Sequence, residues 1–248
     1  MEPASSSDPD SPERTVPTDL DDFAGGQRNG EGESGEGEAA DVDTPTDPYD
    51  HLRGTDLAPL VDRYGELDLS TRGDLFERLV VSIVRQLVST ERADRIVARL
   101  RQRYEITPEV MLGADVDELR ESGLSGRKID YVRNAAEWWA EREPSRETFE
   151  SMSDDAVVGW LGEITGVGDW TARMVLMLGL ERPDVFPVGD YALWKGLERR
   201  TDDGEELSRA EMREIAEPWR PFRSYATLYV WWFYVDETLD TDPEDLTL

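Results

Sequence analysis

The feature that most constrains the fold is a pair of helical runs with a short interruption between them, within residues 154–180. The first run follows Ser153 or Asp154, either of which can cap a helix, and it has apolar side chains at helical spacing: Val157, Trp160, Leu161 and Ile164. Thr165-Gly166-Val167-Gly168 then interrupts the pattern, and a second run carries Thr171, Ala172, Val175, Leu176 and Leu178. Because two helices joined by so short a loop form a helical hairpin, the sequence predicts one over residues 154–180.

The loop of this hairpin suggests a binding role. Gly166 and Gly168 can adopt positive φ and bring bare backbone close to a ligand. Backbone amides at the start of the following helix would suit a phosphate group without any lysine. A Gly-x-Gly loop also fits a tight turn between two core helices, which is the simpler alternative.

The rest of the chain shows helical periodicity and no strand pattern of note. Apolar stripes and capping residues predict helices over residues 57–64, 71–89, 91–104, 116–121, 128–141, 191–200, 208–217 and 223–235, with a further helical start at Pro108. Residues 201–204 are expected to form a loop. Residues 1–46 hold few large apolar side chains, so we expect a disordered acidic tail. The chain is thus predicted to be an all-α domain over residues 47–248 that follows this tail.

The charge is strongly acidic. The first 50 residues contribute −13 to the net charge of −29, so the body of the chain is acidic as well. Lysine occurs only at positions 128 and 195, and arginine supplies the other 25 of the 27 cations. Spread acidity with scarce lysine is similar to the proteins of salt-loving archaea, where concentrated salt screens self-repulsion. An acidic mesophilic protein with a basic partner is the alternative.

Several classes of site are excluded or disfavoured. There is no cysteine, which excludes disulfides, thiolate metal sites and iron–sulfur clusters. The single histidine, His51, is expected to be solvated and disfavours a catalytic metal or a Ser-His-Asp triad. The N-terminus has no signal-peptide pattern, and no run of 18 apolar residues occurs. We therefore expect a cytoplasmic protein with no cofactor and no membrane association.

Two motifs at a characteristic spacing carry a family resemblance. Ile164–Ala172 resembles the hairpin of the helix-hairpin-helix (HhH-GPD) DNA glycosylases, and Phe186–Tyr191 resembles the Pro/Gly-rich loop that ends in their catalytic aspartate. Arg85–Ser89 and Glu217–Trp231 are similar to segments of the alkylbase branch, the DNA-3-methyladenine glycosylase II group. The resemblance covers residues 47–238. It implies two helical lobes with a central cleft, the hairpin on one wall and the aspartate facing inward.

The resemblance also implies roles at the site. Asp190 would be the catalytic carboxylate, although it could instead be only the N-cap of the next helix. The base pocket would be formed by an aromatic wall and its neighbours: Trp170, Trp231, Gln86 and Tyr191. Met174 stands where some relatives have a pocket aromatic, which leaves the range of bases open. Each of the two tryptophans could instead be an ordinary core residue. A core position is the one expected for Trp138, Trp139 and Trp232.

Further residues would contact DNA. Leu87 would be a wedge that fills the gap left by an extruded nucleotide, whereas the position alone would suit a core leucine. Phosphates would be bound by the hairpin and by a second loop, through Gly166, Val167, Gly168, Thr171, Arg127 and Lys128. The last two could equally be a solvated pair. The carbonyls of Ile164 and Val167 are candidates to hold a structural monovalent cation, and no catalytic metal is expected.

The implied reaction is base excision repair by base flipping in double-stranded DNA: hydrolysis of the N-glycosidic bond of an alkylated purine such as 3-methyladenine or 7-methylguanine. Relatives that also nick the strand carry a lysine two residues after the second hairpin glycine, and this position is Trp170. A monofunctional, monomeric, nucleoid-associated enzyme that leaves an abasic site is therefore expected. The alternatives are a glycosylase for a deaminated or oxidised base, and a non-catalytic helix-hairpin-helix DNA-binding module.

Overall fold

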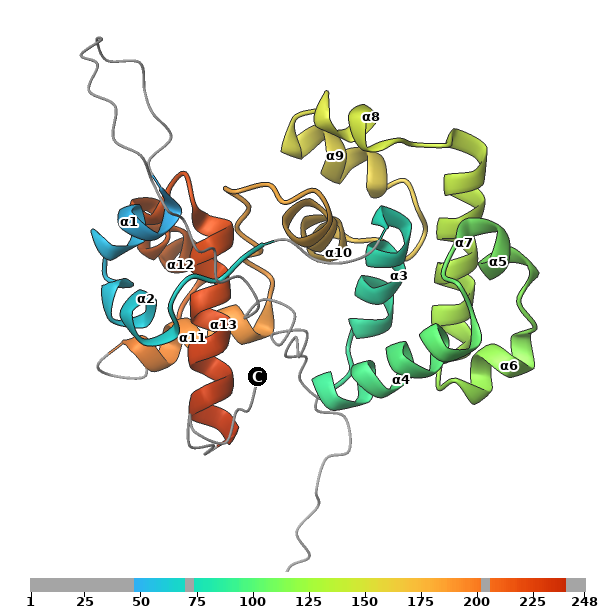
Figure 1. Cartoon of the computed structure of the whole chain (residues 1–248), viewed down its shortest axis with the longest axis horizontal. Coiled ribbons are helices and arrows are strands. Elements are labelled where there is room, and N and C mark those ends of the chain that lie inside the picture. The colour runs from blue at the N-terminus through green and yellow to red at the C-terminus, as the bar shows by residue number, and fades with distance from the viewer. Residues whose placement is uncertain (1–46, 70–73, 202–205, 240–248) are drawn as a thin grey trace, which may run out of the picture.

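The computed structural model describes residues 47–69, 74–201 and 206–239, and all regular secondary structure within these ranges is helical (Figure 1). The predicted all-α class is confirmed. The expected tail at 1–46, most of the expected loop at 201–204 and the start of the helix expected from residue 71 lie outside the described residues. Among the described helices, none is both long enough and apolar enough to cross a bilayer.

The helices form two groups, which we call the terminal lobe and the central lobe (Figure 1). The terminal lobe unites the two ends of the described chain and contains α1 (Pro48–Arg53), α2 (Ala58–Tyr64), α11 (Tyr191–Arg200), α12 (Arg209–Ile215) and α13 (Arg223–Leu239). α13 packs against both α2 and α11. Arg63 and Tyr64 of α2 bind the buried carboxylate of Asp236 on α13, which ties these two helices of the lobe together.

The central lobe is built around one buried helix. It contains α3 (Leu75–Arg85), α4 (Thr90–Arg103), α5 (Pro108–Gly113), α6 (Val116–Glu121), α7 (Gly126–Arg142), α8 (Arg146–Glu150), α9 (Asp154–Leu161) and α10 (Asp169–Met174). Every side chain of α3 except Glu77 is buried, and the helix contacts α4, α7 and α10. Its wide apolar stripe explains this central place, because such a face is stabilised by packing against other helices in a core.

The tryptophans assigned to the core are confirmed there. Trp138 and Trp139 of α7 are 6% and 8% exposed, and their rings pack against Trp160 and Phe149. Trp232 of α13 is 8% exposed and lies beside the ring of Tyr64.

The predicted hairpin is present, with α9 and α10 as its two helices. The second helix differs from expectation because it continues after Met174 as a π-helical turn, Val175–Gly179. This turn is completely buried and packs against α3. The hairpin is therefore fixed to the core helix of the central lobe along its whole second arm.

Other differences concern short elements and one helix end. α1 and α8 were not predicted, and each is too short to show helical periodicity; Asp47 and Ser145 cap them. The helix predicted to run to residue 89 ends at Arg85, since Gln86 is extended and Leu87 has a φ of 54°.

His51 is also not simply solvated, as the sequence led us to expect. Its Nε2 lies 3.1 Å from the carbonyl oxygen of Pro218, and its ring packs edge-on against Phe222. It joins α1 to the segment that precedes α13.

Candidate active site between the two lobes

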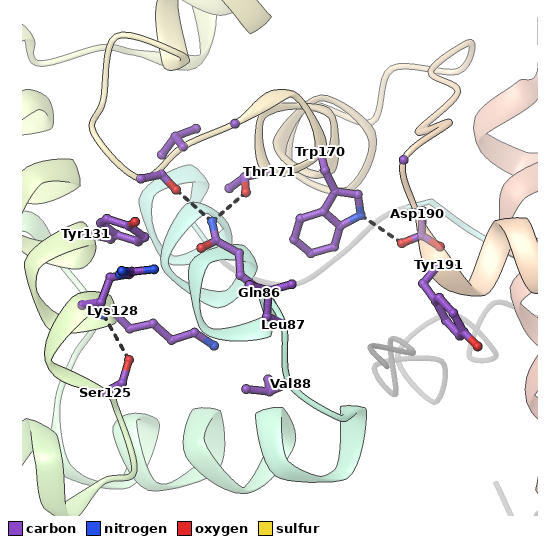
Figure 2. A pocket seen from close by; sticks show the side chains of 15 residues that line it. Gln86, Leu87, Val88, Ser125, Lys128, Tyr131, Trp170, Thr171, Asp190 and Tyr191 are labelled. Carbon is purple, nitrogen blue, oxygen red and sulfur yellow. Dashed lines mark hydrogen bonds between the residues drawn. The ribbon is translucent and has the colours of Figure 1, made fainter. Parts of the chain in front are cut away.

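A cavity of about 960 Å³ opens between the lobes (Figure 2). The turn after α3, the start of α7 and the hairpin loop form its central-lobe walls, and residues 189–191 form its terminal-lobe wall. The cleft expected between two lobes is therefore present, with the hairpin on one side and Asp190 on the other.

Asp190 is 2% exposed and holds three hydrogen bonds. Its Oδ1 accepts from the backbone N–H of Leu193 and from Trp231 Nε1, both at 2.8 Å, and its Oδ2 accepts from Trp170 Nε1 at 2.9 Å. The bond from Leu193 makes Asp190 the N-cap of α11. Asp190 is thus an N-cap, as the alternative predicted, and the same residue also lines the cavity.

The electrostatics of this carboxylate follow from its burial. Burial raises the pKa of Asp190, and the hydrogen bonds from Leu193, Trp170 and Trp231 partly offset that effect because they stabilise the ionised form. All three donors are neutral, so they solvate the negative charge without cancelling it. A fixed, uncancelled charge in a low-dielectric wall can stabilise positive charge that develops beside it.

The two tryptophans expected in the base pocket occupy different positions. Trp170, in the first turn of α10, lines the cavity and bonds the carboxylate from the hairpin side. Trp231 is fully buried and is not among the lining residues, so the structure corrects its expected role as a pocket wall. It holds Asp190 from behind instead. Tyr191 lines the cavity as expected, with its ring edge-on to Trp194 and Tyr234.

Gln86 connects the turn after α3 to the hairpin. Its side-chain Nε2 donates to the carbonyl oxygen of Gly166 and to Thr171 Oγ1, both at 2.9 Å (Figure 2). Gln86 lines the cavity as expected, but its amide nitrogen is committed to the loop. Thr171 also lines the cavity, but the residue is only 2% exposed and its hydroxyl accepts this bond, so its role as a phosphate ligand stays a prediction.

The hairpin loop has free amides, although not all of those expected. The N–H of Val167 donates to the carbonyl oxygen of Ile164 at 3.0 Å, which closes the turn and removes Val167 from the phosphate donors. The backbone N–H groups of Gly168, Asp169 and Trp170 donate to no other described residue. These amides point out of the start of α10, an arrangement that favours an anion.

The two loop glycines serve different purposes. Gly166 has a φ of 102°, and a Cβ there would lie 2.2 Å from the ring of Tyr131. Gly168 has a φ of −99°, and a Cβ there would meet nothing within 4 Å. Gly166 is therefore required by the fold, whereas Gly168 leaves open space at the surface of the cavity.

Tyr131 is the functional candidate that sequence reasoning missed. It lines the cavity and packs on Gly166 from α7. A signal was available: Arg127, Lys128 and Tyr131 lie three and four residues apart, so they share one face of a helix. Without the fold, nothing indicated that this face meets the hairpin.

Leu87 is 79% exposed at the lip of the cavity, so the alternative of a core leucine is wrong. Its φ of 54° is unusual for a residue with a branched side chain and turns it away from the core. Gln86 on one side of it is bound to the hairpin, and Val84 before it accepts a bond from Lys128. The exposed position is thus held by contacts on the same turn.

Arg127 and Lys128 both line the cavity, and Lys128 lies on the side opposite Asp190 (Figure 2). The ammonium of Lys128 donates to the carbonyl oxygen of Val84 at the end of α3. Burial, together with the nearby charge of Arg92, lowers the pKa of Lys128 to about 8. The alternative of an ordinary solvated pair therefore does not describe Lys128.

The remaining expectations concern a cation and the base range. The carbonyl of Ile164 already accepts the N–H of Val167, and a carbonyl oxygen has a second lone pair, so a monovalent cation there stays a prediction. Met174 is 3% exposed and does not line the cavity. Within the described ranges, no group of three or more His, Cys, Asp or Glu side chains is placed to hold a metal ion.

Known proteins share this sequence pattern and fold. The model of the HhH-GPD superfamily of base excision DNA repair proteins matches residues 80–221. YfjP of Bacillus subtilis, named as a putative DNA-3-methyladenine glycosylase, is 26% identical over 191 residues, which cover 73% of this chain and 67% of that protein.

Two solved structures agree with this match. The Schizosaccharomyces pombe 3-methyladenine DNA glycosylase Mag1, in complex with abasic DNA, aligns with a TM-score of 0.67 at 26% identity over 79% of this chain and 98% of that chain. The DNA-3-methyladenine glycosidase of Bacillus halodurans aligns with a TM-score of 0.65 at 30% identity over 80% of this chain and 93% of that chain. The match of the family model over more than half of the sequence, together with the hairpin and the buried aspartate, means that this chain belongs to the HhH-GPD superfamily of base excision DNA repair proteins.

Proposed function

We propose that this protein is a DNA glycosylase that removes alkylated purines, such as 3-methyladenine and 7-methylguanine, from double-stranded DNA and leaves an abasic site. The observation that carries the proposal is the carboxylate of Asp190, buried and uncancelled on one wall of the cavity. The glycine hairpin lies across from it. The relatives named above act on 3-methyladenine according to their names, which supports the same class of substrate here.

The chemistry fits such a substrate. Alkylation at N3 or N7 gives a purine a positive charge and weakens its bond to the sugar, so the base can leave without a general acid. The sugar then develops oxocarbenium character, which the carboxylate of Asp190 would stabilise from a distance or help water to quench. The indole of Trp170 would hold the cationic base by stacking and cation–π attraction, about 1–2 kcal/mol in a desolvated site.

The DNA would be held around this cavity in a bent, opened form. The free amides at the start of α10 would bind a backbone phosphate beside the extruded nucleotide. Leu87 would enter the duplex where that nucleotide had been, since an apolar side chain can compensate for part of the lost stacking. We propose that the protein acts on DNA as a monomer in the cytoplasm, in association with the nucleoid.

We also propose that the enzyme has no lyase activity. A strand-cleaving mechanism needs an amine beside the sugar to form a Schiff base. The hairpin position that would supply it is Trp170, and Lys195 is paired with Glu198 at 2.6 Å. Lys128 lines the cavity but lies across it from Asp190, with its ammonium bound to Val84 (Figure 2).

An excision assay across a panel of lesions tests the function. Duplexes containing 3-methyladenine, 7-methylguanine, a deaminated base or an oxidised base are incubated with the protein at several salt concentrations, and the released base is measured. We expect release of the methylated purines, a strand that breaks only after heating in alkali, and no trapping by borohydride. Release of only the deaminated or oxidised base would assign another lesion. Binding of abasic DNA without any release would indicate the non-catalytic module.

A Leu87→Ala variant is expected to excise about tenfold more slowly from duplex DNA, because the stacking lost on extrusion amounts to a few kcal/mol and the wedge recovers only part of it. Excision of the same lesion from single-stranded DNA should change little. Leu112→Ala is the matched control, since Leu112 is an exposed leucine of α5 outside the cavity. An equal loss on both substrates would argue against a wedge.

The affinity for abasic duplex is expected to fall as the pH rises above about 8, because Lys128 then loses its charge. A nearby phosphate favours the ammonium form, so bound DNA raises the pKa of Lys128 and binding takes up a proton above pH 8. A titration of affinity from neutral to alkaline pH would show this slope. In Lys128→Met the slope should disappear and the affinity at neutral pH should be lower; an unchanged slope would assign the proton to another group.

A further inference from the structure

A second, smaller hollow of about 480 Å³ lies beside the active-site cavity. It opens between the loop that leads into α11 and the start of α12, and Arg209 and Trp194 are among its lining residues. Gly189, Asp190 and Tyr191 line both hollows. The loop that carries the catalytic candidate is therefore a thin partition, with the hairpin on one side and the start of α12 on the other.

Arg209 stands out among the cations of this acidic protein. Most of the described arginines are bound to a carboxylate or a backbone carbonyl, as Arg213 is to the carbonyl oxygen of Arg209. The guanidinium groups of four have no hydrogen bond or ion pair with another described residue: Arg92, Arg99, Arg127 and Arg209. Two of these, Arg127 and Arg209, line the two hollows that meet at Asp190. The chain carries a net charge of −29, and the exposed guanidinium of Arg209 is nevertheless available to an external anion at this place.

The backbone of the partition is also accessible. Gly189 is exposed, and a Cβ there would meet nothing within 4 Å. A polar ligand can thus approach the main chain between Asp190 and Arg209 without steric conflict. The other lining side chains are mostly apolar, including Val188, Leu207 and Met212, and the polar ones are Ser208, Asp190 and Tyr191. The guanidinium of Arg209 is thus the one cationic group among the lining residues.

We propose that this hollow binds a backbone phosphate of the damaged strand, with Arg209 as its ligand, on the side of the extruded nucleotide opposite to the hairpin. An extruded nucleotide has a phosphate on either side, and both must be held if the sugar is to stay at Asp190. The hairpin loop lines only the main cavity, so it can hold one of them. The second hollow shares Gly189, Asp190 and Tyr191 with the main cavity, so a phosphate bound in it would lie on the other side of the same aspartate. This inference rests on the proposed function, because it assumes an extruded nucleotide in the main cavity.

A methylphosphonate scan of an abasic duplex tests the contact. In each duplex one phosphate near a tetrahydrofuran abasic site is replaced by its neutral methylphosphonate, and the affinities of wild type and Arg209→Gln are measured over a series of salt concentrations. Arg209→Gln should bind the unmodified duplex about tenfold more weakly, as expected for loss of a charged hydrogen bond. The slope of log K against log salt should decrease by about 0.9, the value for one phosphate. One methylphosphonate should weaken wild type but not Arg209→Gln.

The matched control is Arg213→Gln, which removes the same charge from the same helix at an exposed residue outside the hollow. It should keep the wild-type salt slope and the wild-type response at every phosphate. Arg209→Lys should retain the salt slope, since a lysine keeps the point charge. A thermal melt of each variant checks that the fold is intact, as expected for exposed side chains.

The binding assay uses an abasic duplex, from which no base can be released. Its result therefore tests the phosphate contact separately from the proposed excision activity. Equal sensitivity of wild type and Arg209→Gln at all phosphates, or a phosphate on the hairpin side, would overturn the inference even if alkylated purines are excised. An Arg209-dependent phosphate contact without any excision would support it and refute the enzyme. Absence of binding to the abasic duplex would overturn both.

Discussion

An Asp190→Asn variant is expected to release alkylated purines about 100- to 1,000-fold more slowly than wild type, while it still binds abasic duplex. The reason is electrostatic. Asp190 supplies an uncancelled negative charge in a buried wall, and an asparagine of the same shape keeps only a weak dipole. The loss of one preorganised electrostatic contact to a transition state amounts to about 3–4 kcal/mol, which corresponds to the expected change in rate.

Single-turnover excision of 3-methyladenine, with affinity for abasic duplex measured in parallel, checks this expectation. Asp155→Asn is the control, because it removes the same charge from an exposed residue of α9. It should excise at the wild-type rate. If Asp190→Asn retained the wild-type rate, the carboxylate would have only its N-cap role. A loss of abasic-site binding equal to the loss of rate would instead show that the substitution had disturbed the cavity.

The raised pKa of Asp190 also sets the direction of two pH effects. Under the proposed mechanism excision requires the ionised form, so the rate should decline as the pH falls through this raised pKa. Stability should respond in the opposite sense. Because the folded protein holds the proton of Asp190 more tightly than the unfolded chain, the penalty for burying the charge is present at neutral pH and is relieved on acidification. The ionised carboxylate of Asp190 thus lowers the stability of the fold, although it is the form on which the proposed activity depends.

The sequence predicted those parts of the site that depend on local signals. The hairpin followed from helical spacing on both sides of a glycine loop, and an N-cap at Asp190 from its place after Phe186-Pro187-Val188-Gly189, whereas the role of Asp190 in the site came from the family resemblance. Both predictions agree with the fold because short-range patterns determine caps, turns and helices. The exposed Leu87 was predicted only through a family resemblance, since periodicity alone suggested a longer helix.

The rest of the site depends on contacts between distant segments, which no local pattern encodes. Trp231 lies 41 residues after Asp190, and only the packing of α13 against α11 places its indole N–H behind the carboxylate. The bond from Gln86 to the hairpin spans 80 residues. The contact of Tyr131 with Gly166 likewise requires α7 to pass the loop. In each case the residue type fitted a plain core or surface role equally well, so the sequence could not select the partner.

Substitution of alanine at the two hairpin glycines is expected to have two different results, one on folding and one on DNA binding. In Gly166→Ala the new methyl group must avoid the ring of Tyr131, which would lie 2.2 Å away, and the φ of 102° is unfavourable for any residue with a Cβ. We expect the free energy of unfolding to fall by about 2–4 kcal/mol, the sum of overpacking and backbone strain. Urea titrations of wild type and variant measure this loss.

A double substitution separates the two causes. Tyr131→Ala removes the ring that obstructs the methyl group, but it leaves the backbone angle unchanged. The pair Gly166→Ala and Tyr131→Ala should therefore be more stable than the sum of the two single effects predicts, by about 1–2 kcal/mol. Strict additivity would mean that the strain at φ, and not the contact with the ring, determines the loss.

Gly168→Ala should fold normally and bind DNA poorly. Its φ of −99° suits alanine, and its methyl group would meet no protein atom within 4 Å. The space it fills is the space through which a phosphate must approach the free amides of Gly168, Asp169 and Trp170. We expect stability equal to wild type and an affinity for abasic duplex reduced at least about tenfold, as for loss of a charge-assisted hydrogen bond. Wild-type affinity in this variant would show that the hairpin is only a turn between core helices, and the proposed grip on the damaged strand would have to lie elsewhere.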